Sequence, residues 1–172
     1  MVELRQGTGM EVAPQRANHP ALQALFEYWL SKRRGRTMPS RADLVLSEIK
    51  PHLAWMSLLE VLPGAADFRY RLIGTRITLY FAADTTGKTV SESYAETPEA
   101  RDIMLALLRQ VVDTKTPIRT YGNLAWLGRG LEDFESLFLP LSDDGETVHG
   151  IMNPFVFDHS SVYLNRRMKP LR

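Results

Sequence analysis

The spacing of apolar residues changes twice along this chain of 172 residues, and this change restricts the possible folds more than any other feature. From Met56 to Leu72 an apolar run is followed by strict alternation, as in β-strands. Between Pro98 and Thr114 apolar residues recur with the period of an amphipathic helix. Strand patterns return from Ile118 onward. The order of strands, helices and strands predicts one mixed α+β domain with an antiparallel sheet.

We expect five strands in this sheet. Two strands, at residues 56–62 and 68–72, should form a hairpin that places Phe68, Tyr70 and Leu72 on one face and two arginines on the other. Three more strands are expected at 118–127, 134–141 and 148–157, separated by glycine-rich and Asp-Gly turns. The helices between the two groups should cover one face of the sheet.

An additional amphipathic helix should precede the sheet. Leu22, Leu25, Phe26 and Trp29 recur at helical spacing until Gly35 ends the pattern, and this helix could cover the other face. Residues 1–17 show no period and are expected to form a flexible leader. Residues 18–160 should then form a single domain, followed by a basic tail at 161–172 that frays or docks to a partner.

Three prolines set local expectations. Pro51 is close enough to the start of a short helix from Ser47 to Leu53, capped by Ser47, to be tolerated there. Pro140 and Pro154 lie inside expected strands, although proline has no N–H to donate to a strand ladder. Each should therefore mark a bulge or the end of a strand.

The composition excludes several kinds of chemistry. The chain has no cysteine, which rules out disulfides, thiolate nucleophiles, Cys-ligated zinc, iron–sulfur clusters and cysteinyl-flavin chemistry. Lys and Arg number 21 against 20 Asp and Glu, so overall charge does not favour nucleic acid. The sequence lacks a secretory signal and a stretch long enough to cross a bilayer, so we expect a cytoplasmic protein with no membrane partner.

Catalytic and metal-binding patterns are also missing from the sequence. His19, His52, His149 and His159 have no metal-ligand spacing, so no metal site is expected. The aspartates fall at turns or on a polar helix face, and no nucleophile has a base at a recognisable spacing. We therefore expect no catalytic residues and no enzymatic activity.

Four local motifs resemble those of small stand-alone PAS-domain proteins common in alphaproteobacteria. These motifs are Trp29 with Lys32-Arg33-Arg34-Gly35-Arg36, then Met38-Pro39-Ser40-Arg41-Ala42-Asp43, then Asp67-Phe68-Arg69-Tyr70-Arg71-Leu72-Ile73-Gly74-Thr75, and Thr86-Gly87-Lys88. The expected order of elements is also that of a PAS domain. The family pattern differs after Asp43, where a second Asp and a Pro usually open the short helix and this chain has Val45 and Leu46.

The resemblance implies a sensor or interaction fold. A PAS domain places its last strand at the centre of the sheet, holds small molecules between sheet and helices, and often dimerises through the outer sheet face. Proteins of this kind generally lack an output domain, which implies a signalling protein partner. Haem-binding PAS domains use a histidine on or near the long helix, and residues 98–114 contain none, so haem as well as cysteinyl-flavin is disfavoured and the cofactor is unknown.

Six residues combine apolar area with polar tips on the expected strands and helices, and these are the candidate ligand-binding residues. They are Tyr70, Tyr80, Asn123, Trp126, Phe138 and Phe155. Aromatic residues at strand spacing are also typical of an ordinary core, so this is a prediction about a region.

A basic segment follows the first helix. Arg33, Arg34, Arg36 and Arg41 could converge on a phosphate, a nucleotide second messenger or an acidic partner. The alternative is that the segment is a solvated helix end, with an internal contact between Arg41 and Asp43. This alternative is favoured in general, because charge runs more often face water.

These observations favour a non-catalytic cytoplasmic PAS-type sensor that binds a small molecule, a protein partner or both, and forms a homodimer. One alternative is a ligand-free interaction module that acts through dimerisation. A second alternative is a small enzyme with the cone-shaped fold of ketosteroid isomerase, although that fold normally begins with its helices together.

Overall fold

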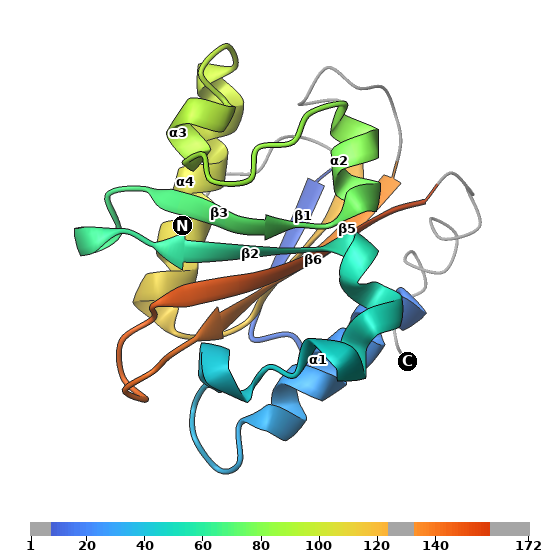
Figure 1. Ribbon diagram of the computed structural model, residues 1–172, viewed down its shortest axis with the longest axis vertical. Helices are drawn as coiled ribbons and strands as arrows, with labels where there is room; N and C mark the ends of the chain where they lie inside the picture. Colours follow the sequence, from blue (N-terminus) through green and yellow to red (C-terminus); the bar gives the residue numbers. More distant parts are fainter. Residues whose placement is uncertain (1–7, 124–132, 159–172) are drawn as a thin grey trace.

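A computed structural model describes residues 8–123 and 133–158 (Figure 1). The elements in these two ranges, in chain order, are β1 Thr8–Val12, α1 Pro20–Lys32, η1 Arg41–Asp43, η2 Leu46–Trp55, β2 Met56–Val61, η3 Pro63–Ala65, β3 Phe68–Ile73, α2 Thr75–Phe81, α3 Val90–Ser93, α4 Pro98–Thr114, β4 Ile118–Asn123, β5 Asp133–Leu141 and β6 Gly150–Asp158, where η marks a 3-10 helix. Within the same ranges, no helix is long and apolar enough to span a bilayer.

The sheet has six strands in the order β1-β4-β5-β6-β2-β3, and each neighbouring pair is antiparallel. The five expected strands are all present, and the last strand, β6, lies inside the sheet between β5 and β2 as expected. The mixed α+β prediction is confirmed, with one strand more than predicted.

The additional strand, β1, corrects the expectation of a flexible leader for the part of residues 1–17 that the structure describes. Thr8–Val12 pairs with β4 along its whole length, with Val12 opposite Ile118 and Glu11 opposite Arg119. The Glu11 carboxylate lies 3.0 Å from the Arg119 guanidinium. A short edge strand is ordered by pairing with its neighbour, so the composition of residues 8–12 alone does not indicate a strand. The expected tail at 161–172 lies outside the described residues.

A bulge changes the expected faces of the first hairpin. Leu58 pairs with Leu72, but Leu59 pairs with Tyr70, so Arg71 is an extra residue in β3. Leu58 and Leu59 are adjacent on β2 and point to opposite faces, so their partners Leu72 and Tyr70 also lie on opposite faces. The prediction that Leu72 shares the face of Tyr70 is therefore wrong. Ile73 takes that place and lines the pocket described below.

The expectation that Pro154 marks a bulge or the end of a strand is wrong, because Pro154 lies in the middle of β6. Ser136 pairs with Phe155 and Leu139 with Met152, so the register is the same on both sides of Pro154. The side-chain amide of Asn153 donates to the Leu137 carbonyl at 2.8 Å and supplies the donor that proline lacks. Pro140 is one residue from the end of β5 and lies beyond the last β4–β5 pair at Phe138, so the expected strand end is found there.

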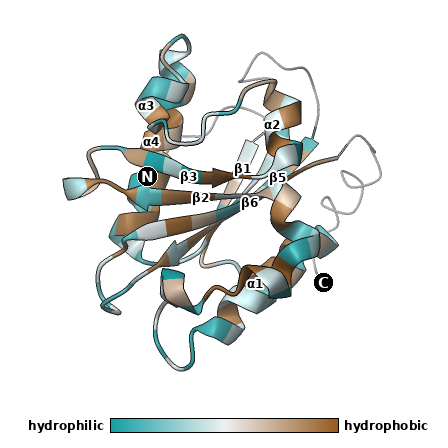
Figure 2. Ribbon diagram, viewed as in Figure 1, coloured by the Kyte–Doolittle hydropathy of each residue, from teal (hydrophilic) through white to brown (hydrophobic). Residues whose placement is uncertain are grey.

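One face of the sheet is covered by α2, α3 and α4, as expected. Thr97 is the N-cap of α4 and Pro98 its first residue, both as predicted. The buried residues of α4 include Leu105, Leu108 and Val111, and α4 packs against β5. Figure 2 shows hydrophobic stretches along β2 and at the end of β3.

The opposite face is covered by α1 and the 3-10 segment η2, as the sequence allowed. Glu135 and Ser136 are neighbours on β5 and therefore point to opposite faces. The buried Glu135 carboxylate accepts the backbone N–H groups of Asn18 and His19, at 2.8 and 2.7 Å, just before α1 begins. The N-cap is His19, whose Nδ1 accepts from Ala21. At the other end of the helix, Trp29 Nε1 donates to the Pro140 carbonyl at 2.9 Å.

The segment before β2 differs from the expected short helix. It is the 3-10 helix η2, its N-cap is Val45 rather than Ser47, and Pro51 lies inside it. It packs closely against the start of α2. A Cβ at Gly74 would overlap the carbonyl oxygens of Leu53 and Ala54, so the glycine in the Leu-Ile-Gly-Thr motif is needed for close approach.

Candidate functional site

A pocket of about 260 Å³ lies between the inner face of the sheet and helices α2, α3 and α4. Its apolar walls come from two strands and from α2 and α4, and its polar tips come from the strands and the helix ends. The lining residues are Ser57, Tyr70, Ile73, Ile77, Phe81, Ala83, Thr85, Ser93, Tyr94, Thr97, Met104, Asn153 and Phe155. None of these described lining residues is an Asp, Glu, His, Lys or Arg.

A buried polar network forms the sheet side of the pocket. Ser57 is 3% exposed and Asn153 is 8% exposed, and they face each other across paired strands. The Ser57 hydroxyl donates to Asn153 Oδ1 at 3.3 Å, and Asn153 Nδ2 donates to the Ser136 hydroxyl at 2.8 Å. Asn153 is therefore held in one orientation, because its amide group serves both the pocket wall and the β5–β6 pairing.

Two tyrosines form the polar end of the pocket nearest α3. Tyr70 comes from β3 and Tyr94 directly follows α3. Burial raises the pKa of the Tyr70 phenol well above its usual value of 10.0, and the electrostatic interaction and hydrogen bond with Tyr94 raise it further. Both causes keep the Tyr70 phenol protonated at neutral pH, so this end presents hydroxyl groups without charge.

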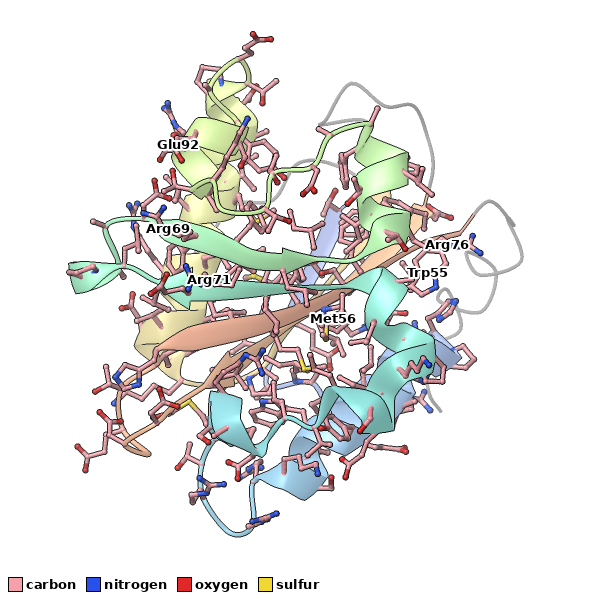
Figure 3. The ribbon with its side chains drawn as sticks, in the orientation of Figure 1. Trp55, Met56, Arg69, Arg71, Arg76 and Glu92 are labelled. Atoms are coloured by element: carbon pink, nitrogen blue, oxygen red, sulfur yellow. The ribbon has the colours of Figure 1, made fainter. Side chains whose placement is uncertain are left out.

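The other end of the pocket is aromatic. Phe81 of α2 and Phe155 of β6 line it, with ring centroids 6.3 Å apart. Both belong to a cluster in which Phe155 stacks on Phe134 and Tyr80 stacks on Phe157. Trp55 closes this cluster at the surface, where the Arg76 guanidinium lies 5.2 Å from its ring (Figure 3).

The structure brings two of the six predicted ligand residues, Tyr70 and Phe155, into the pocket lining. Tyr80 is not among the lining residues, because α2 turns Phe81 to the pocket and stacks Tyr80 on Phe157. Phe138 is a core residue at 3% exposure, and Asn123 ends β4 away from the pocket. Trp126 lies outside the described residues.

Several lining residues were not predicted. Ser57 and Asn153 are small polar residues within apolar strands, and a polar residue at an inward strand position is a signal that a wet or functional site is near. Ile77 and Met104 lie on helices whose rotation relative to the sheet depends on tertiary packing. Tyr94 follows a four-residue helix that the sequence did not indicate.

The predicted basic segment is largely tied into the fold. The Arg36 guanidinium donates to the Lys32 and Arg33 carbonyls and, at 2.6 Å, to the Asp43 carboxylate. The Ser40 N–H and Arg36 together lower the pKa of Asp43 to about 2. The internal contact of Asp43 is therefore with Arg36 rather than with Arg41. Arg34 and Arg41 are exposed, and Arg33 lies over the Trp29 ring.

The histidines do not converge on a site. His19 caps α1, and His149 Nδ1 accepts from the Asp143 N–H. Across residues 8–123 and 133–158, no group of three or more His, Asp or Glu side chains could hold a metal ion. His159 lies outside these ranges.

Comparison with known proteins agrees with this geometry. A search against protein families matches residues 17–153 to the PAS domain, a match that covers most of the chain from just before α1 into β6. No curated protein and no solved structure matches the chain. The cone-shaped fold considered from the sequence is not the one found, because the chain matches the PAS domain and α2, α3 and α4 lie between the first hairpin and the last three strands. The chain belongs to the PAS domain family.

Proposed function

We propose that this protein is a non-catalytic PAS sensor, which binds a small uncharged molecule between its sheet and helices and reports the bound state to a protein partner. The observation that carries the proposal is the pocket lining, in which hydroxyl and amide tips face an otherwise apolar space of about 260 Å³. Pockets of this kind are typical of small-molecule sites.

The size and polarity of the pocket limit the ligand. A cavity of about 150 Å³ is enough for benzene, so this pocket has room for a ring system with one or two polar substituents. Burying a charged group without a counter-charge is costly, and the described lining offers none. A neutral ligand with hydroxyl, carbonyl or amide groups would match Ser57, Tyr94 and the neighbouring hydroxyls.

The lack of charged side chains in the described pocket lining also favours a binding role over catalysis. Acid–base catalysis needs a group that exchanges protons near neutral pH, and the Tyr70 phenol, whose pKa is raised by burial, is too weak an acid for this. The remaining described lining side chains are alcohols, the phenol of Tyr94, one amide, one thioether and hydrocarbons.

Helix α2 offers a route from the pocket to the surface. Ile77 and Phe81 line the pocket, while Tyr80 on the same helix stacks on Phe157 with centroids 3.4 Å apart. A ligand that displaces Phe81 or Phe155 would disturb this stack near the end of β6. Leu79 on α2 is 77% exposed, so a change in α2 would be visible to a partner. Signalling through a partner is also what the resemblance to stand-alone PAS proteins implies.

The ligand-free dimerisation module is the second candidate. PAS domains often dimerise through the outer sheet face, but in this chain α1 and η2 cover that face along β5 and β6. A homodimer through the outer sheet face would use α1 itself or the outer surface of β2 and β3, where Arg69 and Arg71 are found (Figure 3). Both guanidinium groups lie near the Glu60 carboxylate.

Native mass spectrometry of the purified chain, combined with thermal-shift measurements across a panel of neutral and charged ring compounds, tests the proposal. We expect a bound mass or a melting temperature raised by neutral compounds, and a weaker shift in Tyr94→Phe for compounds with polar groups. A dimer with no bound mass and no thermal shift from any compound would favour the interaction module instead.

A further inference from the structure

A second hollow lies on the other side of the molecule, outside the PAS pocket. It has a volume of about 280 Å³ and is formed by the segment between β1 and α1, by α1, and by the turn between α4 and β4. The part of its wall at 13–15 precedes the region that matches the PAS domain. This groove is therefore a feature of this chain rather than of the matched domain alone.

The floor and one lip of the groove are apolar. Phe26 and Trp29 stack at the floor, with centroids 6.4 Å apart and rings within 11° of parallel. Leu30 forms part of the lip and is 39% exposed, which is high for a leucine beside two buried aromatic rings. Pro14 and Pro117 contribute rigid apolar walls.

The charged residues of the groove are both cations. Arg33 and Lys115 line it, and no Asp or Glu is among its described lining residues. The Arg33 guanidinium is fixed, because Nε donates to the Arg36 carbonyl at 2.9 Å and the group lies 5.6 Å from the Trp29 ring. Lys115 ends α4 with a left-handed backbone, φ 55°. Neither cation forms an ion pair with a carboxylate in the part of the chain that the structure describes.

We propose that this groove binds a small organic monocarboxylate with a ring or a short branched apolar body. The apolar body would lie against Leu30 and the two prolines, and the carboxylate would accept from Arg33 and Lys115. Charge complementarity carries this assignment, because two cations beside apolar surface favour an occupant that has both a negative charge and an apolar part. The volume fits one ring and a short side chain, since about 150 Å³ is enough for benzene.

The basic segment at 161–172 has the wrong charge for this groove, since it contains Arg166, Arg167, Lys169 and Arg172. The same argument disfavours that segment from a second copy of the chain. The proposal is independent of the PAS pocket, because Trp29 and α1 pack on the outer face of the sheet and the pocket is on the inner face.

Two-dimensional ¹H–¹⁵N NMR of the full chain, titrated with 3-phenylpropanoate, tests the proposal. We expect saturable shifts of the Leu30, Thr37 and Thr116 amides and of the Trp29 indole N–H, and no saturable shifts with the neutral 3-phenylpropanamide. Arg33→Met and Lys115→Met should each weaken binding roughly threefold to tenfold, whereas Arg33→Lys should keep most of it. Arg34→Met is the matched control, because Arg34 is exposed on the same turn but does not line the groove, and it should bind as the wild type does.

Three results would overturn the assignment. These are equal binding of the acid and the amide, unchanged affinity in both methionine variants, or no shift of the groove signals at millimolar acid. Tighter binding of a short acidic peptide with a leucine anchor than of the free acid would assign the groove to a protein partner instead. Circular dichroism melting curves confirm that each variant is folded, so a loss of binding cannot be mistaken for unfolding.

Discussion

The Asn153 side-chain amide donates to the Leu137 carbonyl at 2.8 Å, at the point in the β5–β6 ladder where Pro154 has no N–H to offer. One side chain thus repairs the strand pairing and also forms part of the pocket wall. The central strand of the sheet and the candidate site therefore depend on the same residue.

Asn153→Ala should lower the free energy of unfolding by about 1–3 kcal/mol, because it leaves the buried Leu137 carbonyl and Ser136 hydroxyl without this donor. Adding Pro154→Val to that variant restores a backbone N–H opposite Leu137 and should recover part of the loss. Urea unfolding of the two single variants and the double variant measures the coupling. A double variant that is no more stable than Asn153→Ala would show that the amide does not replace the proline donor.

Glu135→Gln should detach the start of α1 from the sheet. The Glu135 carboxylate is 2% exposed and accepts from Arg119 and from the N–H groups of Asn18 and His19. Removing its charge leaves the buried Arg119 with only the half-exposed Glu11 carboxylate as a counter-charge, so we expect a loss of about 3 kcal/mol. Glu11→Gln is the matched control, because Glu11 pairs with the same arginine but is 46% exposed, and it should cost less than about 1 kcal/mol. Equal losses in the two variants would contradict this account.

Asp43 should make the stability of the protein depend on pH at the acid end. Its pKa is lowered from 3.8 to about 2 in the folded protein, first by the Ser40 N–H and then by Arg36. This stabilisation is present above pH 3.8 and is lost as the pH falls through about 2. Unfolding free energies measured from pH 5 to pH 2 should fall less steeply for Asp43→Asn than for the wild type. Arg36→Met, which keeps the Ser40 contact, should give an intermediate slope, and identical slopes for all three proteins would refute the assignment.

Gly74→Ala should destabilise the junction of η2, β3 and α2. A Cβ at this position would meet the carbonyl oxygens of Leu53 and Ala54, which are backbone atoms and cannot move aside cheaply. We expect a loss of about 1–3 kcal/mol from this overpacking. Thr75→Ala, at the exposed neighbouring residue, should change stability by less than about 0.5 kcal/mol. Thermal unfolding of both variants distinguishes the close approach from a general sensitivity of this turn.

Much of the fold could be predicted from periodicity and turn chemistry. Local sequence predicts α4, from its apolar periodicity and from Thr97 and Pro98 at its start. It also predicts the antiparallel strand segments. Strand β1 could not be predicted, because Thr8–Val12 is ordered by its pairing with β4 rather than by its own pattern. The regular strand register at Pro154 could not be predicted either, because it depends on the hydrogen bond from the Asn153 side-chain amide to the Leu137 carbonyl of the neighbouring strand.

The site was only partly predictable for a related reason. Tyr70 and Phe155 were placed correctly because strand alternation fixes which face a residue occupies. In α2, apolar residues occur on more than one side of the helix, at Ile77, Leu79, Tyr80 and Phe81, so its rotation could not be inferred. Tyr80 stacks on Phe157, and this contact leaves Phe81 rather than Tyr80 facing the pocket.

The central claim is that the inner pocket holds a neutral ligand, and calorimetric titration of the best neutral panel compound into a pocket-filled variant tests it most directly. Met104→Trp places a larger side chain at a lining position of α4, and Asp102→Trp places the same side chain on the exposed surface of that helix. The account predicts that Met104→Trp weakens binding at least tenfold, that is by about 1.4 kcal/mol or more, while Asp102→Trp binds as the wild type does. Undiminished binding by a folded Met104→Trp protein would contradict it.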